Sequence, residues 1–88
     1  MSEGICTFKY DNDPTILAAS KLILEEGCMP HRVVLRGIEN GKFVTHMENL
    51  VLMGDTWKHR DFYWGHYFER EDALNKAKAD YAERCAKL

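Results

Sequence analysis

Cys28 and His31, in the segment CMPH, are separated by two residues, which is the spacing found in one half of many zinc sites. A structural zinc ion takes four protein ligands, and the sequence contains no second pair of this kind. His59 and His66 could complete the set only if a turn brought them close. We therefore expect neither a metal site nor any other cofactor.

Acid–base chemistry is the next candidate, in the segment Asp61–Asp72, DFYWGHYFERED. No acid or nucleophile stands at a spacing from His66 that implies a catalytic partner. Glu69 and Glu71 stand where a helix is predicted to begin, and carboxylates there stabilise the positive end of the helix. The sequence also contains no phosphate-binding loop, nucleophile elbow or dinucleotide fingerprint. We expect a protein that is not an enzyme and has no catalytic residues.

A pocket for a small ligand, or for a minor enzymatic activity, is the alternative interpretation. The aromatic and histidine side chains near it would be Trp57, His59, Trp64 and His66. A two-layer domain of this size rarely encloses such a pocket, so the sequence favours a binding protein over an enzyme.

Composition limits the classes of partner. The 88 residues are 45% hydrophobic and 30% charged, which predicts a single folded domain over residues 1–88. A formal net charge of −2 disfavours nucleic acid and anionic lipid as partners. Three widely spaced cysteines without a signal peptide indicate a reducing, cytoplasmic setting, and no apolar run is long enough to span a membrane.

The first half of the chain predicts a strand followed by a helix. Ile5–Tyr10, ICTFKY, alternates with a period of two, as a strand does. Asp13 is a suitable helix cap, Pro14 fits the first helical position, and Gly27 supplies a left-handed stop. We therefore predict a helix over about residues 14–26.

A β-hairpin is predicted on both sides of the segment ENGK. A two-residue Asn40-Gly41 loop would mix polar and apolar groups on both faces of the hairpin. A three-residue loop with Gly41 as the bulge residue pairs Val33 with Met47 and Leu35 with Thr45. It also places Arg32 opposite Glu48, so we favour the three-residue loop.

The aromatic segment predicts a last strand with two different faces. Phe62, Trp64, His66 and Phe68 would share the core face, with Tyr63 and Tyr67 on the other. A helix follows from about Arg70 to the C-terminus. Its apolar stripe is Leu74, Ala77, Tyr81, Cys85 and Leu88.

These elements predict an α+β fold of order β-α-β-β-β-α. The expected architecture is a two-layer sandwich, with both helices on one face of a four-stranded, mostly antiparallel sheet. The other face of the sheet would be uncovered. Whether the first strand lies beside the second or the fourth is left open.

The uncovered face is the predicted partner-binding surface, because tyrosine and arginine beside aliphatic residues are typical of interface hot spots. Its residues are Arg32, Val34, Arg36, Val44, His46, Tyr63 and Tyr67. We expect a protein partner, or a second copy in a homodimer, bound through this face or through an edge strand. An accessory or inhibitor-type protein of a phage or mobile element is compatible with such a chain.

From Pro14 onward, the predicted order of elements is similar to that of the double-stranded-RNA-binding domain. That family holds phosphates with lysines at the start of its last helix, whereas this chain has Glu69, Arg70, Glu71 and Asp72 there. The predicted strand Ile5–Tyr10 is an additional departure, and we reject the resemblance. Weak nucleic-acid binding through Arg32 and Arg36 is a second alternative.

Overall fold

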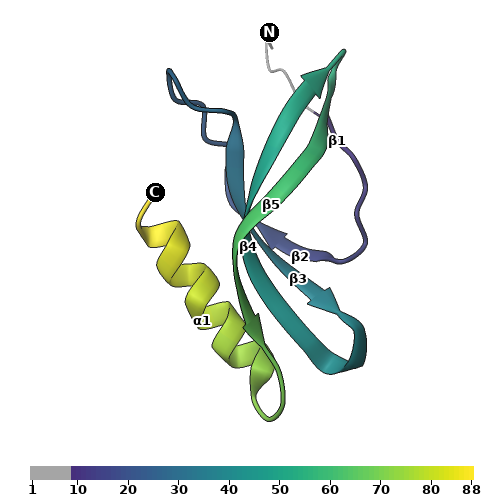
Figure 1. Cartoon of the computed structure of the whole chain (residues 1–88), viewed down its shortest axis with the longest axis vertical. Helices are drawn as coiled ribbons and strands as arrows, with labels where there is room; N and C mark the ends of the chain where they lie inside the picture. Colours follow the sequence, from purple (N-terminus) through teal and green to yellow (C-terminus); the bar gives the residue numbers. More distant parts are fainter. Residues whose placement is uncertain (1–8) are drawn as a thin grey trace, which may run out of the picture.

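The computed structural model describes residues 9–88, which form five strands and one α-helix (Figure 1). The elements are β1 (Lys9–Tyr10), β2 (Ile16–Ala19), β3 (His31–Ile38), the 3₁₀ turn Glu39–Gly41, β4 (Lys42–Met53), β5 (Thr56–Phe68) and α1 (Ala73–Ala86). The prediction of two helices on a four-stranded, mostly antiparallel sheet is therefore wrong, since residues 9–88 have a single helix and a five-stranded mixed sheet.

The sheet curls into a half-barrel. Its order is β1-β5-β4-β3-β2, with β1 parallel to β5 and the other neighbours antiparallel. The guanidinium of Arg32 on β3 lies 4.6 Å from the ring centroid of Tyr10 on β1, although β4 and β5 lie between them in the sheet. This contact requires the sheet to curl toward the face that carries Arg32. We call that side the inner face, and the side against which α1 packs the helix face.

The β3–β4 hairpin confirms the predicted register. Val33 pairs with Met47, Leu35 with Thr45 and Arg32 with Glu48. The last pair, Ile38 and Lys42, encloses a three-residue loop in which Asn40 and Gly41 have φ angles of 62° and 68°. Asn and Gly tolerate this left-handed conformation, which explains why the segment turns here.

The predicted helix over residues 14–26 is wrong, because its first part is the edge strand β2. The carboxylate of Asp13 accepts hydrogen bonds from the backbone N–H and hydroxyl of Thr15, at 2.9 and 2.6 Å, as a helix cap would. The backbone carbonyl of Thr15 instead accepts a bond from Gly37 of β3, at 2.9 Å. The β-branched residues Thr15 and Ile16 favour this extended state, and the ladder with β3 outweighs local helix signals. The predicted first strand is described only from Lys9, where β1 begins.

A bulge in β5 decides which way the aromatic side chains point. His46 of β4 lies opposite two residues of β5, Trp64 and Gly65, and the pairing shifts there. Trp64 has a φ angle of 54°, in the left-handed region. One extra residue inverts the alternation of side chains on either side of it. Phe62 and Tyr67 therefore lie on the inner face, and Tyr63, His66 and Phe68 on the helix face.

The predicted shared core face of Phe62, Trp64, His66 and Phe68 is consequently wrong. The two halves of the segment have opposite phases, and Trp64 itself is 74% exposed. Strict alternation could not reveal this, because it assumes that no residue is inserted.

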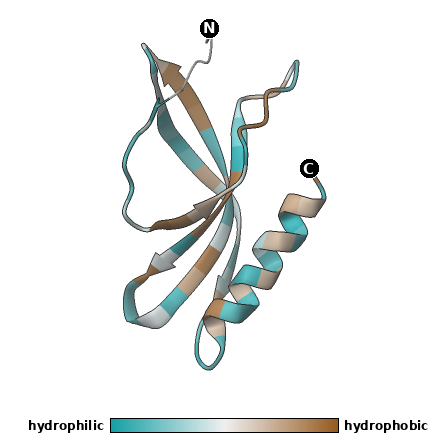
Figure 2. Cartoon of the chain, turned by 180° about the vertical axis from the view of Figure 1, so that it is seen from behind, coloured by the Kyte–Doolittle hydropathy of each residue, from teal (hydrophilic) through white to brown (hydrophobic). Residues whose placement is uncertain are grey.

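Helix α1 covers the helix face with small side chains. Ala73 and Ala77 are buried against the sheet, whereas Leu74 of the predicted stripe is exposed. The fully or nearly buried apolar residues of the sheet lie on both faces: Val33 and Leu35 on the helix face, and Val34, Val44, Leu50 and Trp57 on the inner face. Figure 2 shows the hydrophobic end of β4 and the hydrophobic part of the loop that follows β2.

Candidate functional site

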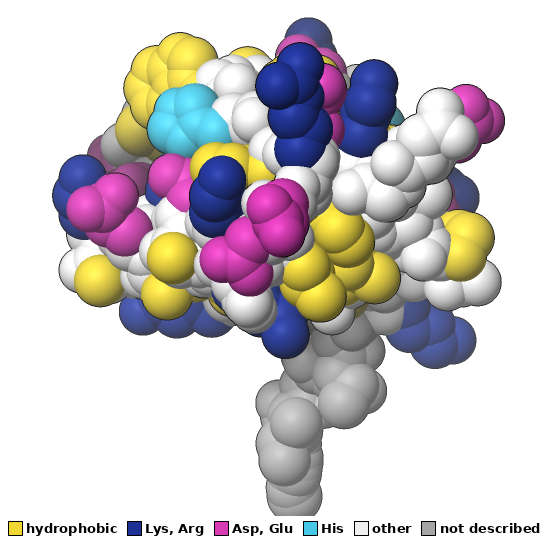
Figure 3. Space-filling model, turned by 90° about the horizontal axis from the view of Figure 1, so that it is seen from below, with side chains coloured by type: hydrophobic (Ala, Val, Ile, Leu, Met, Phe, Trp, Pro, Cys, Tyr) yellow, Lys and Arg dark blue, Asp and Glu magenta, His cyan; other side chains and the backbone are white. Residues whose placement is uncertain are grey.

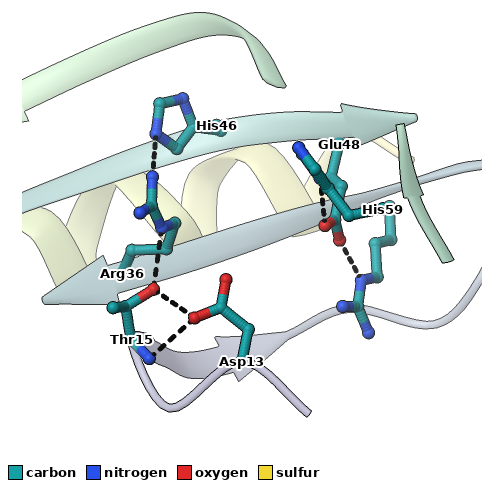
Figure 4. A network of polar contacts seen from close by, with 7 residues as sticks. Asp13, Thr15, Arg36, His46, Glu48 and His59 are labelled. Carbon is teal, nitrogen blue, oxygen red and sulfur yellow. Dashed lines mark hydrogen bonds and ion pairs between the residues drawn. The ribbon is translucent and has the colours of Figure 1, made fainter. Parts of the chain in front are cut away.

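The inner face carries a buried ionic cluster across three strands. Glu48 of β4 is 1% exposed and accepts a bond from Nε of Arg32 at 2.6 Å. Its other carboxylate oxygen lies 2.8 Å from Nδ1 of His59 on β5 (Figure 4). Both oxygens of Glu48 therefore have partners, and this carboxylate links β4 to β3 through Arg32 and to β5 through His59.

A second set of polar contacts links the segment just before β2 to β3 and β4 on the same face. Arg36 donates to the Thr15 hydroxyl at 3.0 Å and to Nε2 of His46 at 3.4 Å (Figure 4). The bonds that Asp13 accepts from Thr15 lower the pKa of that carboxyl. Since a guanidinium only donates, the Nε2 atom of His46 is an acceptor and its ring is neutral.

His46 is held in its neutral form by its surroundings. It is 5% exposed, and burial lowers its pKa to about 4, assisted by the positive charges of Arg36 and Arg84. Its ring stacks on Phe62, with the centroids 4.4 Å apart and an interplanar angle of 19°. Within residues 9–88 its Nδ1 atom has no hydrogen-bond partner. A histidine whose pKa is about 4 and that is buried from solvent is poorly suited to proton transfer at neutral pH.

The predicted partner-binding face is therefore the inside of the curl. Val34 and Val44 are fully buried, Arg32 and His46 are buried, and Arg36 is half-buried. Tyr67 is exposed beside His46, whereas Tyr63 lies on the helix face. The expectation that this face is uncovered is wrong, because the curl closes over it.

The residues of the alternative pocket also do not meet. Trp57 and His59 lie on the inner face, where Trp57 is buried and His59 binds Glu48. His66 lies on the helix face, with its Nδ1 atom 3.0 Å from Asp80 of α1. The second alternative was nucleic-acid binding through Arg32 and Arg36. The guanidinium groups of both residues instead make the internal contacts described above.

Trp64, on the helix face, combines a strained backbone with an exposed side chain. A large side chain at a φ angle of 54° is a backbone outlier, which costs about 1–3 kcal/mol. The strained position is fixed by Arg84 of α1, whose Nη2 atom donates to the Trp64 carbonyl at 2.5 Å. The Trp64 side chain is 74% exposed, and its ring centroid lies 5.1 Å from that of Tyr63 in an edge-on arrangement.

Asp80 organises the contact between α1 and the bulge. It accepts bonds from the Thr45 hydroxyl and from Nε of Arg84, the latter at 3.2 Å, and it also pairs with His66. Burial raises the pKa of this carboxyl, but hydrogen bonds from Thr45 and His66 outweigh burial, and the pKa lies below its usual value. The ionised carboxylate thereby orients Arg84 toward the Trp64 carbonyl.

Two hollows adjoin the C-terminal end of α1, and Lys87 and Leu88 line both. The smaller, of about 270 Å³, is lined by Met47, Trp64, Arg84, Lys87 and Leu88. The larger, of about 540 Å³, lies between α1 and the loop after β2 and is lined by Lys21, Leu22, Ile23, Leu24, Glu25, His31, Lys87 and Leu88. We call the two together the Trp64 groove. Figures 1 and 2 both show the end of α1 directed toward that loop.

The opposite end of the molecule has a mixed surface. Figure 3 shows it from below, with hydrophobic side chains in separate groups between basic and acidic ones. The Trp64 groove differs from this end in that a strained, exposed aromatic residue stands at the wall of its smaller, mainly apolar hollow.

Sequence reasoning named Trp64 only as part of the alternative pocket and of the core face, and it did not propose Arg84, Lys87 or Leu88 as site residues. The available signal was Gly65, since a glycine inside a strand pattern often marks a bulge. A Cβ atom at Gly65 would lie 3.0 Å from Nδ1 of His46, so the missing side chain makes room for that ring.

Residues 9–88 contain no group of three or more His, Cys, Asp or Glu residues placed to hold a metal ion. In the same range, no helix is both long and apolar enough to cross a membrane. Comparison with protein-family models, with curated proteins and with solved structures found no match.

Proposed function

We propose that this chain is a small non-enzymatic binding domain, of the accessory or inhibitor type, that docks a segment of a partner protein in the Trp64 groove. The observation that carries the proposal is the exposed Trp64 side chain, which a strained backbone and a bond from Arg84 hold at the wall of an apolar hollow. Tryptophan is enriched among the residues that dominate binding energy at interfaces.

The energetics support a role in binding rather than in folding. An indole that is 74% exposed gains little from burial in the folded chain, while its backbone conformation costs about 1–3 kcal/mol. Glycine or asparagine would occupy this bulge position without that strain. A partner that covers the indole would recover the apolar burial that the isolated chain forgoes.

The shape of the groove favours a peptide segment over a small molecule. The larger hollow is lined by exposed side chains such as Leu24 and Leu88, so it is a surface depression and not an enclosed cavity. Pockets for small ligands normally bury most of the ligand. Two depressions that share Lys87 and Leu88 in their walls instead suit successive side chains of one segment.

Affinity selection from a random peptide library tests the proposal. The variant Trp64→Asn removes the indole but tolerates the left-handed backbone, so it should remain folded. Met53→Asn is the matched control, because Met53 is also exposed, at the β4–β5 turn. We expect peptides that bind the unmodified chain and the Met53 variant equally, and the Trp64 variant at least about tenfold more weakly.

Two results would contradict the proposal. One is that no peptide is enriched on the unmodified chain relative to Trp64→Asn. The other is that the enriched peptides lose affinity for Met53→Asn instead. Denaturation curves of both variants separate loss of binding from loss of fold.

A homodimer and a cytoplasmic setting belong to the same proposal. A second copy could occupy the groove, and light scattering at two concentrations detects it as a mass that doubles. Cys28 and Cys85 are free thiols, which supports a reducing compartment. An edge strand such as β2 is the remaining route for partner contact.

A further inference from the structure

We infer that the segment bound in the Trp64 groove is acidic, with carboxylates placed around apolar anchor residues. This inference rests on the function proposed above and specifies the chemistry of the partner. It follows from the charges that line the two hollows.

The groove has the opposite charge sign to the whole chain. Its side chains include three basic residues, Lys21, Arg84 and Lys87, and one carboxylate, Glu25. The chain carries a formal net charge of −2. A basic surface directs association toward an anionic partner.

Arg84 and the lysines differ in their availability. Arg84 is engaged with Asp80 and with the Trp64 carbonyl. Lys21 and Lys87 are exposed, and no ion pair with another residue of the described part of the chain holds their ammonium groups. The two lysines are thus the charges that an incoming carboxylate can reach.

The position of the lysines sets the pattern of the ligand. Lys87 lines both hollows beside Leu88, and Lys21 lines only the larger one. A segment whose apolar side chains enter the hollows would therefore present acidic residues between and beyond those anchors. Exposed pairs of this kind are weak and salt-sensitive, so they act mainly on selectivity and association rate.

Two displayed peptide libraries test the inference. One combines apolar residues with Asp and Glu, and the other combines the same apolar residues with Lys and Arg. On the unmodified chain at low salt, we expect the acidic library to be enriched about tenfold over the basic one. The double variant Lys21→Glu/Lys87→Glu should reverse this preference, and raised salt should reduce it.

The outcomes separate this inference from the proposed function. Equal enrichment of both libraries, lost in Trp64→Asn, would overturn the acidic preference while leaving the groove as the binding site. Enrichment that persists in Trp64→Asn would overturn the groove itself. An acidic preference that survives the double lysine reversal would also refute the inference. Thermal unfolding confirms that each variant is folded.

Discussion

Replacing Glu48 by Gln should destabilise the fold severely. The carboxylate is 1% exposed and lies 2.6 Å from the Arg32 guanidinium, which is itself 8% exposed. The isosteric amide keeps the volume but leaves a buried positive charge uncompensated. Removing one partner of a buried pair costs about 3–5 kcal/mol. A domain of this length has a total stability of about 4–13 kcal/mol, so the loss is a large fraction of it.

Urea unfolding followed by the fluorescence of the buried Trp57 measures this loss. With a slope of about 1–2 kcal/mol per M, the midpoint should fall by about 1.5–5 M. The double variant Arg32→Met/Glu48→Leu removes both charges and should recover most of the stability. Glu69→Gln is the control, because its pair with Lys42 is exposed and 3.7 Å long, and it should change stability by less than about 0.5 kcal/mol.

The reasoning about the buried cluster would be refuted by two observations. A midpoint for Glu48→Gln within about 0.5 M of the unmodified chain would mean that water or relaxation neutralises the Arg32 charge. A double variant no more stable than the single one would mean that the cost is one of packing and not of charge.

Three further changes test the rest of the fold. The pKa of His46 is about 4 when folded, against 6.5 for an unperturbed histidine, so the unfolded chain binds the extra proton between these values. Stability should therefore fall by about 3 kcal/mol as pH drops from 6.5 to 4. The variant His46→Phe should weaken this dependence of the unfolding free energy on pH, measured from unfolding curves at several pH values. An unchanged dependence would exclude His46 as its cause. Gly65→Ala should lower the stability by about 1–2 kcal/mol, because its Cβ would lie 3.0 Å from His46 and 3.1 Å from Tyr67. The measurement is the melting temperature, and an unchanged value would mean that the rings move aside freely. Asp80→Asn should cost about 1–3 kcal/mol in urea unfolding by leaving Arg84 without its carboxylate, and a smaller loss would show that α1 is held by packing alone.

The sequence was sufficient to predict the β3–β4 hairpin. Asn40 and Gly41 determine where the chain turns, and the charges of Arg32 and Glu48 distinguish the correct register from its alternative. Both signals are local or depend on two adjacent strands. The final helix was predicted for the same reason, although it begins at Ala73 and not near Arg70.

The wrong predictions concern parts of the chain whose structure depends on tertiary contacts. Asp13 and Pro14 give a genuine helix-start signal, but pairing with β3 outweighs it, as the bond from Gly37 to Thr15 shows. The curl of the sheet depends on contacts between distant strands, such as Arg32 with Tyr10, so a face that looked open was inside.

The candidate site was missed for a related reason. Alternation placed Trp64 in the core, whereas the bulge exposes it. A single inserted residue inverts the side-chain pattern, and a period-two count cannot detect it.

The pairing of β1 with β5 has a consequence for the order of folding. Asp11 and Lys58, which flank this pairing, are 47 residues apart, whereas β3 and β4 are joined by a three-residue loop. Closing the longer loop costs about 2 kcal/mol more in chain entropy, so the antiparallel meander should assemble first and β1 should dock late. Until β1 docks, Arg32 lacks the Tyr10 ring that covers it, and the ionic cluster of the inner face remains hydrated. The desolvation of these charges is thereby postponed to the last step of folding, when most of the apolar core has already formed.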